Sequence, residues 1–312
     1  METVLLDFDR IKILEPHETD SVFITLESMR KLWLQRTNWH PALEIAGPDS
    51  NLEEYIHYYT LGATLYMDAR DRGWKSYKNL SKMYNRVLIK KLGWLYEKFL
   101  FELSEYLGEC KYEDDLALPG FHIYQFGAAP DKRKHHRCLH YDGQWFYGRK
   151  YFKEKYTNID FRNQLSYTFT IKVPHNGAAI ALWNLPENKK KKATSIQRNF
   201  PQNVIDRYQT LDYVKEIKDN KTIEDPWKFK LFEKDCGDLE QYMPVVIPHL
   251  EGHSFYYYGM IMHQMILGDS FNKGDYRITF QGHGLKCDGI WWLFWCLFGV
   301  LWMLISYILN LI

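Results

Sequence analysis

The sequence predicts an α+β fold: an antiparallel β-barrel or sandwich, a helical N-terminal layer and a C-terminal transmembrane helix. Three observations predict it. Apolar residues recur every three or four positions before residue 115, short β-branched and aromatic runs follow from Leu116, and residues 290–312 contain no charged side chain. We therefore expect three regions, which are residues 1–115, 116–288 and 289–312.

The N-terminal region, residues 1–115, is expected to be mainly helical. Apolar side chains follow a spacing of three and four over residues 51–72 and again over residues 76–108. A helical layer cannot bury its apolar face alone, so we expect this region to pack on a sheet formed by later residues.

The central region, residues 116–288, changes to the pattern of strands. Its β-branched and aromatic runs are separated by Gly, Pro, Asn and Asp, and they read PGFHIYQFGA, LSYTFTIKVP, AAIALWNLP, PVVIPHL, HSFYYYGMIMHQMIL and YRITFQGHG. Several short strands in series predict an antiparallel barrel or sandwich.

Residues 185–240 interrupt these strands as a polar insertion. The insertion begins with the basic run Lys189–Lys192, which we interpret as a solvated loop, with a contact to anionic lipid headgroups as the alternative. The later stretch 201–217 can form a helix that caps the mouth of the barrel.

The C-terminal stretch reads IWWLFWCLFGVLWMLISYILNLI over residues 290–312. About 20 apolar residues in a helix span the hydrocarbon core of a bilayer. Trp291 and Trp292 lie where an interfacial aromatic belt is expected. We therefore expect a single-pass C-terminal membrane anchor with the rest of the chain facing the cytosol, and a buried core helix is the alternative interpretation.

Charge and cysteine content exclude some classes of protein. The chain has 40 Lys and Arg against 39 Asp and Glu, so no overall charge favours nucleic acid as a partner. Five scattered cysteines without CxxC spacing argue against a disulfide framework or a zinc site and favour a reducing compartment. The N-terminus is acidic and lacks the apolar run of a secretory signal.

The candidate chemistry begins with the sequence His140-Tyr141-Asp142. On a strand, residues i and i+2 point to the same face, so an imidazole and a carboxylate can converge on one ion. Non-haem iron(II) oxygenases bind the metal with two histidines and one carboxylate and leave the other positions open. The second histidine must come from a distant strand that lies beside the first in the closed barrel.

The order of the motifs resembles the iron(II)/2-oxoglutarate-dependent dioxygenases, a prolyl-hydroxylase-like superfamily with a double-stranded β-helix (jelly-roll) fold. LPGFHIYQFG resembles the strand before the metal motif, and LHYDGQW resembles the motif strand. EGHSFYYYGMIMHQMIL is similar to the strand pair that bears the distal histidine, here His263, with Gly252 and Gly259 at its turns. DYRITFQGHG resembles the last strand with its Arg-x-Thr, here Arg277 and Thr279. Ala178 departs from the Gly-Gly turn that is frequent in the family.

The resemblance implies both the cofactors and their ligands. Fe(2+) would be held by His140, Asp142 and His263. The remote carboxylate of 2-oxoglutarate would be bound by Arg277 with help from Thr279 and Tyr124. The implied reaction uses dioxygen, hydroxylates a protein, lipid or small-molecule substrate, and releases succinate and CO2.

Several alternatives stay open from the sequence. His135, His136, His249, His253 and His283 are rival ligands, and we expect His283 to sit in a local hydrogen-bond network. Arg277 can instead be a simple ion-pairing residue. The alternative functions are a catalytically silent, membrane-tethered binding or scaffold module and a cupin-like metalloenzyme that does not use 2-oxoglutarate.

Overall fold

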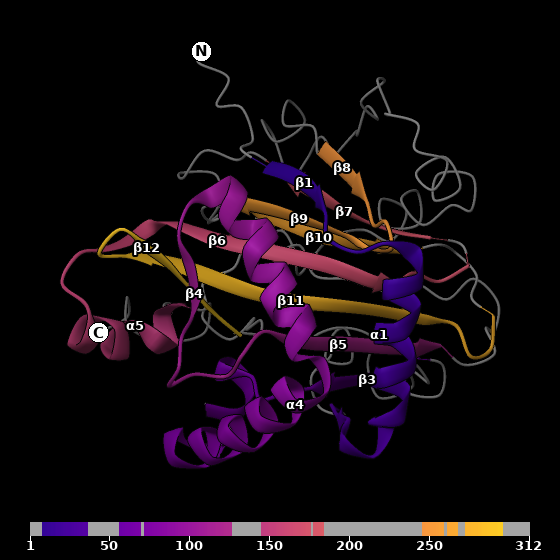
Figure 1. Ribbon diagram of the computed structural model, residues 1–312, viewed down its shortest axis with the longest axis horizontal. Coiled ribbons are helices and arrows are strands. Elements are labelled where there is room, and N and C mark those ends of the chain that lie inside the picture. Colours follow the sequence, from indigo (N-terminus) through magenta and orange to yellow (C-terminus); the bar gives the residue numbers. More distant parts are fainter. Residues whose placement is uncertain are drawn as a thin grey trace, which may run out of the picture.

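The computed structural model of the 312-residue chain describes residues 8–36, 56–69, 72–126, 145–175, 177–183, 245–258, 261–267 and 272–295. Within these ranges the strands form two sheets, and two long helices cross one side of the larger sheet (Figure 1).

The large sheet is built almost entirely from antiparallel pairs. Its main path runs in the order β1 (Phe8–Lys12), β9 (His253–Tyr258), β6 (Ile159–Lys172), β11 (Tyr276–Cys287), β5 (Gly120–Phe126), β3 (Ile56–Leu61) and β2 (Leu34–Gln35). Off this path, β12 (Ile290–Phe294) pairs with β11 and runs parallel to β4 (Cys110–Tyr112).

The small sheet has the order β10 (Met262–Leu267), β7 (Ala178–Trp183) and β8 (Val245–Pro248). Side chains of β7 and β8 form an apolar cluster with Phe255 and Tyr257 of β9, so the small sheet covers one face of the large sheet. All six stretches that the sequence predicts as strands form strands, and two antiparallel sheets face to face are compatible with the predicted jelly-roll core.

Helices α1 (Pro16–Ser28) and α4 (Trp74–Leu107) pack on the other face of the large sheet, and the shorter helix α5 (Trp145–Lys155) packs against Phe294 of β12. Short helical turns are η1 (Arg30–Leu32) and η3 (Leu65–Ala69). Figure 1 shows α1 and α4 crossing the strands. Phe99 of α4 contacts Phe169 of β6 and Phe280 of β11 with ring centroids 5.8 and 5.0 Å apart, which places the main apolar core between helix and sheet.

The N-terminal region is only partly helical. Helix α4 confirms the helix expected over residues 76–108, but the expected helix over residues 51–72 is wrong for Ile56–Leu61, which form β3. β3 lies between β2 and β5, and Tyr58 and Thr60 pair with Tyr124 and His122. Aromatic residues on both faces of a covered strand imitate a helical spacing, which explains the error.

The expected transmembrane helix from residue 290 is also wrong at its start. Asp288 and Gly289 adopt positive φ values of 51° and 90° and turn the chain, so Ile290–Phe294 return along β11 as β12. Asp-Gly is a strong signal for such a two-residue hairpin. Trp291, Leu293 and Trp295 are buried in the core. In the described ranges no helix combines the length and apolarity needed to cross a bilayer, and residues 296–312 lie outside them.

The insertion at residues 185–240 falls outside the described part of the chain, as do His135, His136, His140, Asp142 and Gly259. The predictions made for these residues therefore stay predictions.

Candidate functional site

The face of the large sheet that meets the small sheet is rich in buried polar side chains. Adjacent strands contribute them in register, because residues directly opposite each other share a face. The buried polar residues of this inner face are Thr60, His122, Ser166, Thr168, Thr170, Arg277, Thr279 and His283. Enclosing polar groups between two sheets costs free energy unless they find partners, so this layer marks the place for a polar ligand.

Arg277 is the charged residue at the centre of this layer. It lies on β11 opposite Tyr124 of β5, which is in turn opposite Tyr58 of β3. The Tyr58 and Tyr124 rings stack with centroids 4.6 Å apart, and the Arg277 guanidinium carbon lies 5.5 Å from the centre of the Tyr124 ring. Three neighbouring strands thus hold one cation against a pair of stacked aromatic rings.

The guanidinium of Arg277 is buried without a carboxylate from the described residues. Only 3% of Arg277 is exposed, and its Nε has no hydrogen-bond partner within the described ranges. Burial lowers the pKa of Arg277 to about 10, because removing water disfavours its charged form, while Tyr124 and Tyr58 act in the opposite direction. Arg277 is therefore still a cation at neutral pH and is ready to bind a carboxylate.

The polar atoms around Arg277 extend to three residues that sequence reasoning missed. Trp295 Nε1 donates to His122 Nε2 at 3.3 Å, and the Tyr58 hydroxyl lies 3.0 Å from His122 Nδ1. Since the indole can only donate, a neutral His122 carries its proton on Nδ1 and donates to the Tyr58 oxygen. The hydroxyl proton of Tyr58 then points away from His122 and can be donated to another group in this layer.

Different signals could have revealed these missed residues. His122 and Tyr124 are two apart in the predicted strand FHIYQF, so alternation alone places both on one face. Tyr58 was hidden by the wrong helix over residues 51–72, and Trp295 by the expected transmembrane segment.

Thr279 and Tyr124, the other predicted ligands of 2-oxoglutarate, both lie on the inner face with Arg277. Thr279 pairs across the sheet with His122 and is fully buried, and it accepts a hydrogen bond from Gln281 Nε2 at 3.0 Å. The structure therefore brings Arg277, Thr279 and Tyr124 together on adjacent strands.

His263 enters the space between the sheets from β10 of the small sheet. It is 3% exposed, lies opposite Leu182 of β7, and contacts Tyr257 of β9 on the large sheet. Its Nδ1 lies 3.0 Å from the carbonyl oxygen of Ile261, and the Tyr257 hydroxyl is 3.2 Å from Nε2.

The carbonyl of Ile261 fixes the tautomer of His263. A carbonyl oxygen can only accept, so the imidazole proton is on Nδ1 and Nε2 keeps its lone pair. Histidines that bind metals usually donate the other ring N–H to a carbonyl or carboxylate in this way. Nε2 is then the acceptor for the Tyr257 hydroxyl, so a metal that binds His263 at Nε2 would replace this hydrogen bond. The two further ligands predicted, His140 and Asp142, lie outside the described residues.

The rival histidines occupy other positions. His283 Nδ1 is 3.1 Å from the Ser166 hydroxyl, which confirms the expected local hydrogen bond. His249 Nδ1 lies 3.0 Å from the Thr170 hydroxyl, whereas His253 Nδ1 lies 3.1 Å from the Glu251 carbonyl at the start of β9. Gly252 precedes β9 with φ +80°, and a Cβ there would lie 2.5 Å from the Leu14 carbonyl oxygen, so a glycine is required.

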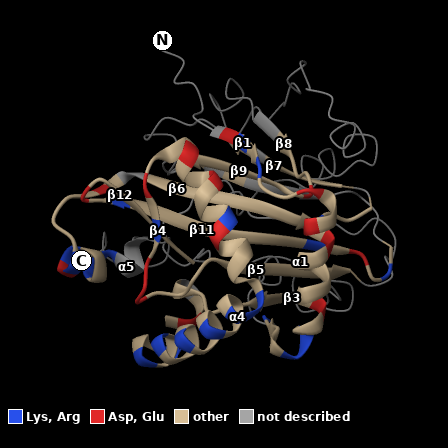
Figure 2. Cartoon of the chain, viewed as in Figure 1, with Lys and Arg blue, Asp and Glu red and all other residues tan. Residues whose placement is uncertain are grey.

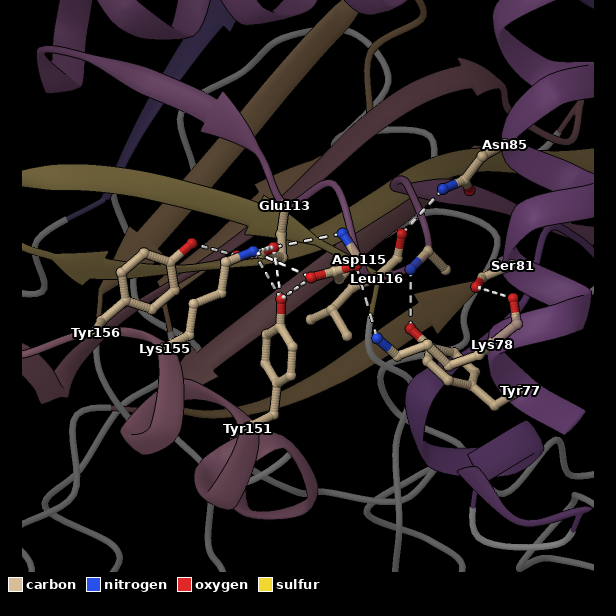
Figure 3. Close-up of polar contacts among 11 residues, drawn as sticks. Tyr77, Lys78, Ser81, Asn85, Glu113, Asp115, Leu116, Tyr151, Lys155 and Tyr156 are labelled. Atoms are coloured by element: carbon tan, nitrogen blue, oxygen red, sulfur yellow. Dashed lines mark hydrogen bonds and ion pairs between the residues drawn. The ribbon is translucent and has the colours of Figure 1, made fainter. Parts of the chain in front are cut away.

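A second polar cluster holds α5, whose first residue follows Asp142 by three positions. The carboxylate of Glu113 accepts hydrogen bonds from the hydroxyls of Tyr151 and Tyr156 and from the Lys155 ammonium (Figure 3). The Glu113 side chain is fully buried, whereas 35% of the Lys155 side chain is exposed. The cluster ties α5, which follows the predicted metal motif in the chain, to the loop between β4 and β5.

Comparison with known proteins shows likeness in structure only. No family model and no curated protein matches the chain by sequence. An N-substituted L-amino acid dioxygenase from Burkholderia ambifaria, solved in complex with α-ketoglutarate, is 13% identical over 92% of this chain and 86% of its own, with a TM-score of 0.44. HygX from Streptomyces hygroscopicus, solved with nickel, 2-oxoglutarate and hygromycin B, is 10% identical over 89% of this chain and 82% of its own, with a TM-score of 0.38.

The epimerase SnoN from nogalamycin biosynthesis is a third similar structure. It was solved with Fe3+, α-ketoglutarate and nogalamycin RO, and it is 9% identical over 90% of this chain and 81% of its own, with a TM-score of 0.41. All three were solved with 2-oxoglutarate (α-ketoglutarate) bound. Because their identity and superposition are low, the functional conclusion depends on the side chains of this chain alone.

Proposed function

We propose that this protein is an iron(II)- and 2-oxoglutarate-dependent oxygenase whose site lies between the two sheets. One observation carries the proposal: Arg277 is a buried cation, stacked on Tyr124, that has no carboxylate partner among the described residues. A dicarboxylate with one end on Arg277 and the other toward His263 would supply the missing negative charge.

The proposed roles follow from the chemistry of each side chain. Arg277 binds the remote carboxylate of 2-oxoglutarate through parallel charge-assisted hydrogen bonds, and the hydroxyls of Thr279, Tyr124 and Tyr58 add neutral donors. His263 coordinates the metal through Nε2 together with His140 and Asp142. Iron(II) with 2-oxoglutarate supplies the oxidising chemistry when both are bound. The apolar cluster of β7, β8 and β9 keeps water from the site.

The substrate and the reaction outcome belong to the same proposal. We propose hydroxylation of a protein, lipid or small molecule, with release of succinate and CO2.

The proposal is tested by separating metal binding from 2-oxoglutarate binding. Wild type, His263→Ala, Arg277→Met and the exposed control Arg10→Met are compared by thermal shift with Mn2+ alone and with Mn2+ plus 2-oxoglutarate. Ligand at 100 times its Kd stabilises a folded protein by about 2.7 kcal/mol. We expect His263→Ala to lose the response to Mn2+, and Arg277→Met to keep it but lose the response to 2-oxoglutarate.

Turnover provides the second readout. Wild type and Arg10→Met should release succinate from 2-oxoglutarate in the presence of Fe2+, and His263→Ala and Arg277→Met should not. Undiminished 2-oxoglutarate binding by Arg277→Met would contradict the role proposed for Arg277. A wild type that responds to Mn2+ but not to 2-oxoglutarate would favour a metalloenzyme that does not use 2-oxoglutarate. Absence of both ligand responses in the wild type would favour a silent binding module.

A further inference from the structure

Helix α4 changes character at a kink. Leu92 has non-helical backbone angles, φ −132° and ψ 18°, and the next residue is Gly93. Before the kink every charged side chain of the helix is basic, namely Lys75, Lys78, Lys82, Arg86, Lys90 and Lys91. After it, three of the four charged residues are acidic, Glu97, Glu102 and Glu105, with Lys98 as the exception. Figure 2 shows the basic part in blue at the lower left.

The basic half of α4 has one face in the core and one face in solvent. Tyr77, Tyr84 and Leu88 are buried on the inner side. Lys82, Arg86 and Lys90 are exposed on the outer side at a spacing of four residues, so they form one row along the helix. Lys78 pairs with Asp115, but no carboxylate in the described ranges forms an ion pair with this row.

Large apolar side chains stand exposed beside this basic row. Met83 is 46% exposed, Ile89 is 50% exposed and Trp94 is 40% exposed. Met83, Arg86, Lys90 and Trp94 follow each other at spacings of three and four, so apolar and basic groups share one surface. We call the exposed residues Lys82, Met83, Arg86, Ile89, Lys90 and Trp94 the α4 outer face.

This combination fits the surface of an anionic bilayer better than a nucleic acid. Basic side chains are attracted to lipid phosphates and carboxylates, and exposed Met, Ile and Trp can enter the boundary between headgroups and acyl chains. A nucleic acid offers phosphates but no apolar layer for Met83 and Ile89, and the chain as a whole has a net charge of only +1.

We propose that the α4 outer face docks this protein onto anionic phospholipid membranes as a peripheral contact. The contact is made by side chains of a folded helix that also packs on the large sheet, so docking requires no rearrangement of the core. It is independent of the iron site, and of whatever residues 296–312 contribute.

The test is co-sedimentation of the full chain with vesicles of phosphatidylcholine alone or with 30 mol% phosphatidylserine. Four proteins are compared: wild type, the charge-reversal variant K82E/R86E/K90E, the apolar variant M83S/I89S and the control K31E/K153E/K273E. The control reverses three exposed lysines elsewhere and so makes the same change in net charge. Circular dichroism checks that each variant is folded.

We expect wild type and control to bind the anionic vesicles at least tenfold better than the neutral ones. K82E/R86E/K90E should bind the anionic vesicles at least tenfold more weakly than wild type. M83S/I89S should bind them several-fold more weakly than wild type, and this difference should persist when salt is added. Equal binding by wild type and K82E/R86E/K90E would overturn the proposal, as would equal wild-type binding to both vesicle types. Tighter binding of wild type to a 30-base-pair DNA duplex at the same ionic strength would also overturn it.

Discussion

At the scale of single residues, the buried charge of Arg277 destabilises the ligand-free protein and is suited to binding a carboxylate. Its side chain is buried on the inner face with an aromatic contact and without a counter-ion from the described residues. Taking a charge out of water costs more than one cation–π contact returns. A residue that destabilises the free protein and is suited to a bound carboxylate is typical of a binding site.

Replacing Arg277 with Met should therefore stabilise the ligand-free protein while abolishing its response to 2-oxoglutarate. Removing the desolvated charge and filling its space with an apolar chain should raise the free energy of unfolding by about 1–2 kcal/mol. Urea unfolding of Arg277→Met and of the exposed control Arg10→Met measures the difference. A loss of stability in Arg277→Met larger than that of the control would show that Arg277 is a structural ion-pairing residue instead.

The pKa of Arg277 gives a pH dependence with a defined sign. Because burial lowers this pKa to about 10, the free protein loses the cation as the pH rises through that value. Affinity for 2-oxoglutarate should be constant from pH 7 to 9 and fall about tenfold per pH unit above 10. Equilibrium dialysis, with circular dichroism to confirm folding, measures this. An affinity that stays constant to pH 11 would mean that another group binds the carboxylate.

At the scale of elements, Glu113 joins α5 to the rest of the fold. Burial raises the pKa values of Tyr151 and Tyr156, and their hydrogen bonds to the Glu113 carboxylate raise them further, so both hydroxyls stay protonated donors. Burial alone would lower the pKa of Lys155, but the hydrogen bond and charge of Glu113 raise it overall. Three donors thus share one buried acceptor, and Tyr151 and Lys155 also reach the half-exposed Asp115 at 3.3 Å.

Glu113→Ala should loosen α5 more than it unfolds the protein. Loss of the shared acceptor should cost about 1–3 kcal/mol, and α5 should become accessible to trypsin after Lys153 and Lys155. Asp115→Ala removes a neighbouring, half-exposed carboxylate and serves as the control, for which we expect less than about 1 kcal/mol. Equal trypsin cleavage of the two variants would show that Glu113 does not anchor α5.

The strands that carry the site were predictable from the sequence, whereas two of their neighbours were not. Arg277 and Thr279 are two apart in a run with clear strand alternation, so their common face could be inferred. The sequence pattern predicts helices for Ile56–Leu61 and Ile290–Phe294, because a strand covered on both faces loses its alternation. The turn at Asp288-Gly289 held the missing signal for β12. Tyr58 and Trp295 were lost from the predicted site with those strands.

At the scale of the whole molecule, the two faces of the large sheet have different roles. Its outer face is lined by aromatic and aliphatic side chains such as Phe169, Tyr167 and Phe280, and it packs on α4. Its inner face carries the polar layer around Arg277 and meets the small sheet. Substitutions on the polar inner face can therefore change ligand binding, while the packing of the outer face on α4 maintains the fold.

Trp295 follows the β11–β12 hairpin and contributes both to packing and to the polar layer of the inner face. Its ring occupies the space beside Gly62 and Gly120, where an added Cβ would lie 2.4 and 2.1 Å from it, and its Nε1 donates to His122. Trp295→Ala should cost about 3–5 kcal/mol of unfolding free energy, because it leaves a large cavity and removes the indole N–H that donates to His122 Nε2. It should also weaken 2-oxoglutarate binding, since His122 positions Tyr58.

The matched control for Trp295→Ala is Trp94→Ala, which removes an exposed indole from the surface of α4. We expect it to cost less than about 1 kcal/mol and to leave 2-oxoglutarate binding unchanged. Urea unfolding and ligand titration of both variants decide between two structures for this part of the chain. If Trp295→Ala were as stable as Trp94→Ala, Trp295 would not be a core residue, and the assignment of Ile290–Phe294 to a core strand would have to be abandoned in favour of the membrane-spanning helix first expected from the sequence.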